Sequence, residues 1–97
     1  MSLEVTRTER DETITLTVKG EIDMSNAGEF RRALEDSQAP GRLVLDLTGV
    51  DYLDSAGVKV LYDHHDRRPE VLVSPGAVIL RVLAITGLDD LMAVREI

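Results

Sequence analysis

Two short, uninterrupted apolar runs constrain the fold of this chain more than any other feature of its sequence. Leu43–Leu45 and Val71–Val73 have the length of strands, and no polar residue alternates within them. Such runs are typical of buried strands in a parallel sheet with helices packed against it. The segment between them places apolar residues at helical spacing, which predicts a helix over about Ser55–His65. Strand, helix and strand in this order predict an α/β fold.

The first twenty residues predict an antiparallel pair of strands. Apolar and polar residues alternate with the two-residue period of half-buried strands over Leu3–Arg7 and Thr13–Lys19. The polar segment Glu9–Glu12 is expected to form the turn between them, and Gly20 is expected to end the second strand. The sheet is therefore expected to be mixed, with parallel strands added to an antiparallel pair.

A helix is predicted directly after this pair of strands. Asn26 and Glu29 have the spacing of a capping box, which places a helix over about Ala27–Ser37. Pro40 and Gly41 are expected to close it, because neither residue favours the interior of a helix.

A third helix and a short final strand complete the predicted order. Ser74 and Pro75 offer an N-cap followed by proline at the first helical position, which predicts a helix over about Pro75–Ile85. Gly87 suits the left-handed residue that follows a helix, and Leu91–Val94 is expected to form a last strand. The prediction is a single α/β domain over residues 1–97, with a mixed, mostly parallel sheet of four to five strands packed with helices.

Length and composition exclude several functions. At 97 residues the chain suits one domain, and without cysteine it forms no disulfide, thiolate nucleophile or cysteine-based metal site. The formal charge of −7 argues against nucleic acid, because phosphate binding needs clustered Lys and Arg. The first twenty residues are rich in charge, and no segment offers the ~20 apolar residues of a membrane span. We expect a cytoplasmic protein that binds neither nucleic acid nor a membrane.

Patterns typical of catalytic and metal sites are weak or missing. The sequence contains neither G-x-G-x-x-G nor G-x-x-x-x-G-K-[ST], so it predicts no nucleotide cofactor. Ser55 lies nine or ten residues before His64 and His65 on one predicted helix. That spacing is about 14 Å at 1.5 Å per residue, too far for a nucleophile and its base. Adjacent residues of Asp63–Asp66 point about 100° apart on a helix, so this run predicts no metal site.

The segment Asp54–Val58 carries the most informative pattern in the chain. Asp54 is a good N-cap and places Ser55 in the first turn of a helix. The first-turn N–H groups have no helical partners and tolerate an anion, and the hydroxyl of Ser55 is accessible there to another protein. Ala56 and Gly57 are small and leave the approach open. On this pattern alone a purely structural role remains open, with Asp54 as a cap and Gly57 as a close-packing residue.

Three blocks of the sequence resemble the STAS family, and within it the single-domain anti-sigma factor antagonists. They are Gly20–Asp23, Asp54–Val58 and Val82–Asp89, and their order and spacing match the family over nearly the whole chain. The resemblance implies a sheet with helices. It also implies that Ser55 is a phosphorylation site and that Asp23 lies beside it.

The resemblance implies a partner-switching cycle rather than an enzyme. The unphosphorylated protein would bind an anti-sigma factor that is also a serine kinase, and this binding would free a sigma factor. Phosphorylation of Ser55 would end the complex, and a PP2C-type phosphatase would restore it. No cofactor and no metal are implied. The residues expected to bind the partner are Asp23, Asp54, Ser55, Ala56, Gly57 and Lys59.

Three departures from the family and two alternative functions stay open, and one departure is that the second helix and the loop after it are shorter than usual. Lys59, where relatives commonly have a small residue, is either within reach of a phosphate on Ser55 or an ordinary solvated lysine. The chain also stops at Ile97, without the final helix common in relatives. One alternative is a constitutive STAS-like scaffold or transporter-associated subunit without a phosphoswitch. The other is a small enzyme built on Asp23, Asp54 and Ser55, which lacks an evident activating base.

Overall fold

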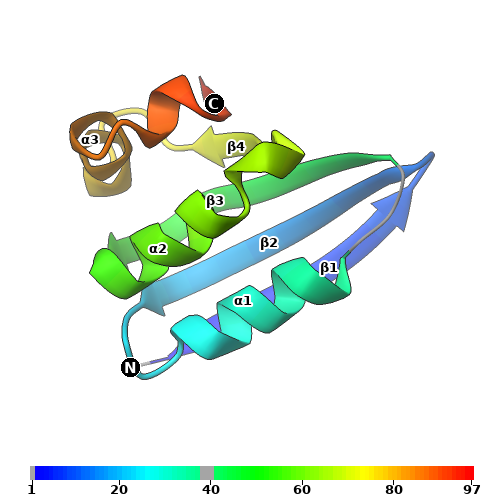
Figure 1. The fold of residues 1–97 in the computed structure, drawn as a ribbon, viewed down its shortest axis with the longest axis horizontal. Coiled ribbons are helices and arrows are strands. Elements are labelled where there is room, and N and C mark those ends of the chain that lie inside the picture. The colour runs from blue at the N-terminus through cyan, green and yellow to red at the C-terminus, as the bar shows by residue number, and fades with distance from the viewer. Residues whose placement is uncertain (1, 38–40) are drawn as a thin grey trace.

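The alternating N-terminal segment forms a hairpin in the computed structural model, which describes residues 2–37 and 41–97 (Figure 1). Strand β1 (Leu3–Arg10) pairs antiparallel with β2 (Thr13–Ile22), as predicted. The predicted turn was too long, because only Asp11 and Glu12 separate the strands. Both have positive φ, 52° and 63°, which matches the right-handed twist of a two-residue hairpin. Strand β2 also continues past Gly20, which was expected to end it.

Three parallel strands extend the hairpin into one sheet with the order β1-β2-β3-β4-β5. Strand β3 (Arg42–Leu53) pairs with β2, β4 (Glu70–Val73) with β3, and β5 (Ala93–Glu96) with β4. The predicted mixed, mostly parallel sheet is confirmed. Strand β3 is longer than the apolar run Leu43–Leu45 because it stays paired with β2 well beyond that run, through two shifts of register. The pairing ends at Ile22 and Leu53, shortly before the next helices begin.

Three α-helices occur among the described residues, each after a parallel-paired strand. They are α1 (Ala27–Asp36), α2 (Ser55–Asp63) and α3 (Val78–Ile85). Helix α2 is shorter than predicted, because the chain tightens into a 3₁₀ turn at His65–Arg67. Helix α1 ends with Ser37 as its C-cap, and the closing role predicted for Pro40 lies outside the described residues.

Helix α3 begins later than its sequence pattern predicted. The hydroxyl of Ser74 donates to the carbonyl of Thr48 on β3, so it holds the sheet instead of capping a helix. Gly76 then has a φ of 74°, and the helix starts at Val78 with Ala77 as N-cap. Gly87 has a φ of 78° after the helix end, as predicted. The final strand was also placed slightly early, since β5 begins at Ala93.

The hydrophobic core lies between the sheet and its helices, and Figure 1 shows α1 and α2 side by side in front of β2 and β3. Helix α1 contributes Phe30 and Leu34, which are fully buried. Helices α2 and α3 add Val60, Leu61, Ile79 and Leu83, and the strands contribute inward residues that include Ile14, Leu16, Val18, Leu43, Leu45, Leu47, Val71 and Val73. Outside this layer, the threonines of β2 stay half-buried. The starts of α1 and α2 therefore lie at one end of the sheet, where β2 and β3 finish.

No helix of the described residues has the length and hydropathy needed to cross a membrane.

Candidate functional site at the start of helix α2

Asp54 holds the start of helix α2 through backbone hydrogen bonds. One carboxylate oxygen, Oδ1, accepts from Ala56 N–H at 2.8 Å and from Gly57 N–H at 3.2 Å. The residue itself is extended, with φ −95° and ψ −172°, as expected for an N-cap. The predicted capping role of Asp54 is confirmed, and it fixes Ser55 as the first helical residue.

Ser55 is exposed at this position, and its neighbours differ in accessibility. Ala56 is half-buried, and Gly57 is buried. A Cβ atom at Gly57 would lie 2.9 Å from Ile22 Cγ2 and even closer to the side chain of Leu53. Gly57 therefore lets α2 pack directly on the ends of β2 and β3, which is the structural role left open above. Gly57 was also expected to leave the approach to Ser55 open, but it is buried and does not form part of that surface.

The loop Asp23–Asn26 lies beside Ser55 because Asp54 also binds it. The second carboxylate oxygen of Asp54, Oδ2, accepts from Met24 N–H at 3.2 Å. Asp54 N–H donates in turn to the carbonyl of Ile22 at 3.1 Å, just before the loop. Asp23 and Asp54 therefore lie at the same end of the sheet, as the sequence blocks implied. Asp54 is the residue that joins the loop to α2.

Asn26 does not form the capping box that the sequence predicted. Its side chain makes no capping hydrogen bond to α1. It is buried, accepts from Asp23 N–H at 2.9 Å and donates to the carbonyl of Glu21 at 2.8 Å. The amide is thus used inside the loop, where it satisfies one donor and one acceptor of the backbone.

The Asp23 carboxylate is a charged acceptor at this surface. It accepts hydrogen bonds from the hydroxyl and the backbone N–H of Ser25. The Ser25 hydroxyl beside it is the main cause that lowers the pKa of Asp23 from its ordinary value. The carboxylate is therefore ionised near neutral pH and adds negative charge next to Ser55.

Lys59 points along α2 away from Ser55. Its Nζ lies 3.1 Å from Asp63 Oδ2, one helical turn further along, and 70% of its side chain is exposed. Arg31 of α1 binds the same carboxylate at 3.0 Å. Lys59, and after it Arg31, lower the pKa of Asp63. This ion-pair network engages the Lys59 ammonium on the side opposite to Ser55.

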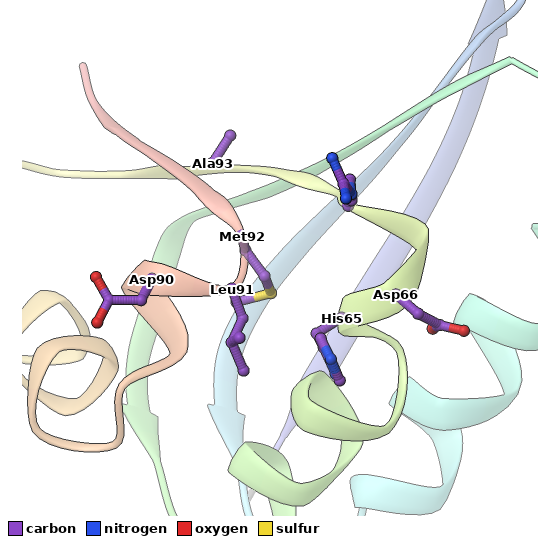
Figure 2. Close-up of a pocket in the computed structure, with 7 residues that line it drawn as sticks. His65, Asp66, Asp90, Leu91, Met92 and Ala93 are labelled. Carbon is purple, nitrogen blue, oxygen red and sulfur yellow. The ribbon is translucent and has the colours of Figure 1, made fainter.

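A hollow of about 670 Å³ lies at the other end of the sheet, before β4 and β5 begin (Figure 2). Its described lining includes His65, Asp66, Arg68 and Asp90, but no Ser, Thr, Cys or Lys. His65 Nδ1 is hydrogen-bonded to the carbonyl of Tyr62. No group of three or more metal-ligating side chains occurs among the described residues. The hollow is therefore separate from Ser55, and its described lining holds no hydroxyl, thiol or amine side chain.

The chain matches a known protein family over almost its whole length. A family model described as the STAS domain matches residues 4–96. The chain belongs to the STAS family. The match covers both the Asp23 loop and the start of α2, so the resemblance of the three sequence blocks extends to almost the whole chain.

Two relatives of this chain are named anti-sigma factor antagonists. An anti-sigma-B factor antagonist of Listeria monocytogenes is 34% identical over 105 residues, covering 100% of this chain and 92% of that protein. The anti-sigma-F factor antagonist RsfB of Mycobacterium tuberculosis is 31% identical over 94 residues, covering 91% of this chain and 77% of that protein.

Solved structures show the same fold. An anti-sigma factor antagonist from Mycobacterium paratuberculosis superposes with a TM-score of 0.85 at 28% identity, covering 96% of this chain and 85% of that chain. SpoIIAA in its unphosphorylated form superposes with a TM-score of 0.74, covering 97% of this chain and 88% of that chain. At 17% identity the likeness to SpoIIAA establishes the fold alone.

The sequence predicted that Asp23, Asp54 and Ser55 lie together, but it indicated neither the contact of Met24 nor the role of Asn26 in the loop. Nothing in the local sequence distinguishes Met24, because its backbone N–H bonds to a residue thirty positions away. Asn26 was noticed for the wrong reason. Its burial, at 6% exposure, is the property that sets it apart, and burial depends on the folded loop.

Proposed function

We propose that this chain is an anti-sigma factor antagonist that is switched by phosphorylation of Ser55. The observation that carries the proposal is the exposed Ser55 at the first position of α2, with Asp54 and the Asp23 loop tied to it. Family membership and the functions of the relatives support the same conclusion. In this proposal the protein acts in the cytoplasm by binding an anti-sigma factor, and it catalyses no reaction of its own.

The surface around Ser55 favours a partner with complementary positive charge. Asp23 and Asp54 contribute negative charge at this end of the sheet, in a chain of net charge −7. Opposite charges across an interface speed association and fix its orientation. The proposed partner is an anti-sigma factor that is also a serine kinase, and a PP2C-type phosphatase reverses the modification.

A phosphate on Ser55 acts locally in this proposal. It adds roughly −1.5 to −2 charge at a helix N-terminus, where free N–H groups and the helix dipole stabilise an anion. The fold is therefore retained. In the complex the same phosphate is desolvated beside Asp23 and Asp54, and charge repulsion then opposes binding. Far-UV circular dichroism of the two forms tests this point, because a large loss of helix on phosphorylation contradicts a local mechanism.

Affinity capture from a lysate of the source organism tests the proposal. The baits are the wild type, Ser55→Ala and Ser55→Asp, with bound proteins identified by mass spectrometry. A fourth bait, Thr8→Asp, adds the same charge on exposed β1 at the opposite end of the sheet. We expect every bait except Ser55→Asp to retain an ATP-binding anti-sigma factor.

Three outcomes contradict the proposal. Equal retention of one protein by all four baits removes the phosphoswitch and favours a constitutive scaffold. Failure of the wild type to retain any anti-sigma factor removes the antagonist function. Loss of binding by Thr8→Asp as well assigns the effect to overall charge instead of to Ser55.

A further inference from the structure

Beyond the bond from Asp54 N–H to the Ile22 carbonyl just before it, the Asp23–Asn26 loop is tied to the start of helix α2 by one carboxylate. Among the described residues, the hydrogen bonds of the loop itself are local, joining Asp23 to Ser25 and Asn26 and joining Asn26 to Glu21. Met24 N–H is the exception, because it donates to Asp54 Oδ2 across thirty positions of sequence. The position of the loop relative to Ser55 therefore depends on Asp54.

Asp54 uses its two oxygens for two separate tasks. Oδ1 caps α2 at Ala56 and Gly57, while Oδ2 holds Met24 N–H. A cap needs only one acceptor oxygen, and asparagine or serine supplies one as well as aspartate does. The second oxygen is therefore not required to form the helix. What it adds is the fixed position of the loop.

The loop presents an apolar side chain between polar neighbours. Met24 is 83% exposed, although its backbone N–H is held by Asp54. Methionine is flexible and polarisable, and it is over-represented at binding surfaces because it adapts to irregular partner surfaces. A fixed backbone with a free side chain keeps Met24 available for contact beside Asp23 and Ser55.

We propose that Asp54 is a positioning residue for partner binding, which holds the Asp23 loop so that Met24 contacts the partner next to Ser55. This inference rests on the proposed function and extends it to a named contact. Asp54 acts through Met24 and Asp23, and the apolar contact of Met24 adds affinity that the acidic groups alone do not provide.

The variant Asp54→Asn separates the two tasks of this residue. The amide oxygen of asparagine accepts from Ala56 and Gly57 and keeps the cap. Its NH₂ group cannot accept from Met24 N–H, so the link to the loop is lost. Asp51→Asn is the matched control, since it removes the same charge from an exposed position on β3 near this end of the sheet.

Three measurements on these variants test the inference. We expect amide hydrogen exchange at Met24 to rise about tenfold in Asp54→Asn, while Ala56 and Gly57 keep their protection. The dissociation constant for the purified ATP-binding anti-sigma factor of the same organism is expected to rise about tenfold, with the melting temperature nearly unchanged. Asp51→Asn is expected to change neither exchange at Met24 nor affinity by more than about twofold.

A double-mutant cycle distinguishes positioning from loss of charge. Met24→Ala is expected to weaken binding about tenfold. If Asp54 acts through Met24, the double variant Asp54→Asn with Met24→Ala binds much as either single variant does. Fully additive losses overturn the inference, and so does unchanged Met24 exchange in Asp54→Asn. Failure of the wild type to bind contradicts the proposed function instead, and the exchange measurement then still tests the link between Asp54 and Met24.

Discussion

Helices α1 and α2 begin side by side at one end of the sheet (Figure 1). Their N-cap residues nevertheless make different hydrogen bonds. Asp54 caps α2 with its side chain, whereas Asn26 makes no capping hydrogen bond to α1. Asn26 is turned into its own loop, where it binds Asp23 N–H and the carbonyl of Glu21. The two residue types are nearly equal as caps in isolated helices, so the difference arises from the fold.

The length of the connection before each helix explains this difference. Between β3 and α2 stands only Asp54, so little loop backbone needs a partner. Residues 23–26 lie between β2 and α1, so their backbone N–H and C=O groups belong to neither the sheet nor the helix. Buried backbone groups must be paired, and an asparagine side chain supplies both a donor and an acceptor. In the longer connection before α1, the side chain of Asn26 therefore binds loop backbone groups instead of capping the helix.

Asn26→Ala is expected to have the largest effect on stability among changes at the two helix starts. It leaves Asp23 N–H and the Glu21 carbonyl without their partner in a part-buried loop. The expected loss is about 2–3 kcal/mol in the free energy of unfolding, measured by urea denaturation. Asp54→Ala removes the cap of α2 together with the exposed bond to Met24 N–H, and it is expected to cost about 1 kcal/mol, mostly from the cap.

Serine at each position sharpens the comparison, because serine caps helices well but cannot replace the asparagine amide. Asp54→Ser is expected to retain most of the stability that Asp54→Ala loses. Asn26→Ser is expected to remain nearly as unstable as Asn26→Ala. Recovery of stability by Asn26→Ser means that Asn26 is a cap after all.

The glycines of the two helices are expected to respond to alanine in opposite directions. Gly57 packs on Ile22 and Leu53, so a methyl group there forces the helix or its neighbours to shift. We expect Gly57→Ala to destabilise the fold by about 1–2 kcal/mol. Gly28 in α1 has no atom within 4 Å of an added Cβ, and Gly28→Ala is expected to stabilise by about 0.5–1 kcal/mol.

Thermal and urea unfolding of both variants check this pair. A neutral or stabilising Gly57→Ala shows that α2 can move away from the sheet end at no cost. A destabilising Gly28→Ala shows that α1 has less room than its exposed position indicates.

The type of each strand and the starts of α1 and α2 were predictable from the sequence, whereas the lengths of the strands and the start of α3 were not. Alternation in β2 and the continuous apolar runs of β3 and β4 record burial directly, so strand type and the mixed sheet followed from them. The Ser74–Pro75 pattern failed because the Ser74 hydroxyl binds the Thr48 carbonyl on a neighbouring strand. The length of β3 was missed because it depends on pairing with β2 that continues beyond the apolar run.

The same limit applies to the candidate site. Asp54 and Ser55 were recognisable because a cap and the residue after it form a local pattern. The contact between Asp54 and Met24 joins segments thirty positions apart, and no local pattern encodes it. Gly57 was correctly noted as small, but only the packing on Ile22 shows that its size serves the core.

The smallest expected effect concerns the pH dependence of Asp23 in the loop before α1. Hydrogen bonding, chiefly from the Ser25 hydroxyl, lowers the pKa of Asp23 below its ordinary value. The pKa of Asp23 is lower in the folded protein than in the unfolded chain. The interaction therefore stabilises the fold at any pH above the pKa of the unfolded chain. The stabilisation is lost as pH falls below about 4 and through the folded pKa.

Ser25→Ala tests this assignment by an NMR titration of the Asp23 carboxyl. Removing the hydroxyl is expected to raise the pKa of Asp23 toward its ordinary value, while the Ser25 backbone N–H still donates to the carboxylate. The stability difference between wild type and variant is then present at neutral pH and disappears in acid. An unchanged pKa in Ser25→Ala shows that the backbone of the loop alone sets the charge of Asp23. In that case backbone N–H groups hold the carboxylate at both helix starts, Asp23 before α1 and Asp54 before α2. The two helix starts then differ only in the hydrogen bonds of Asn26.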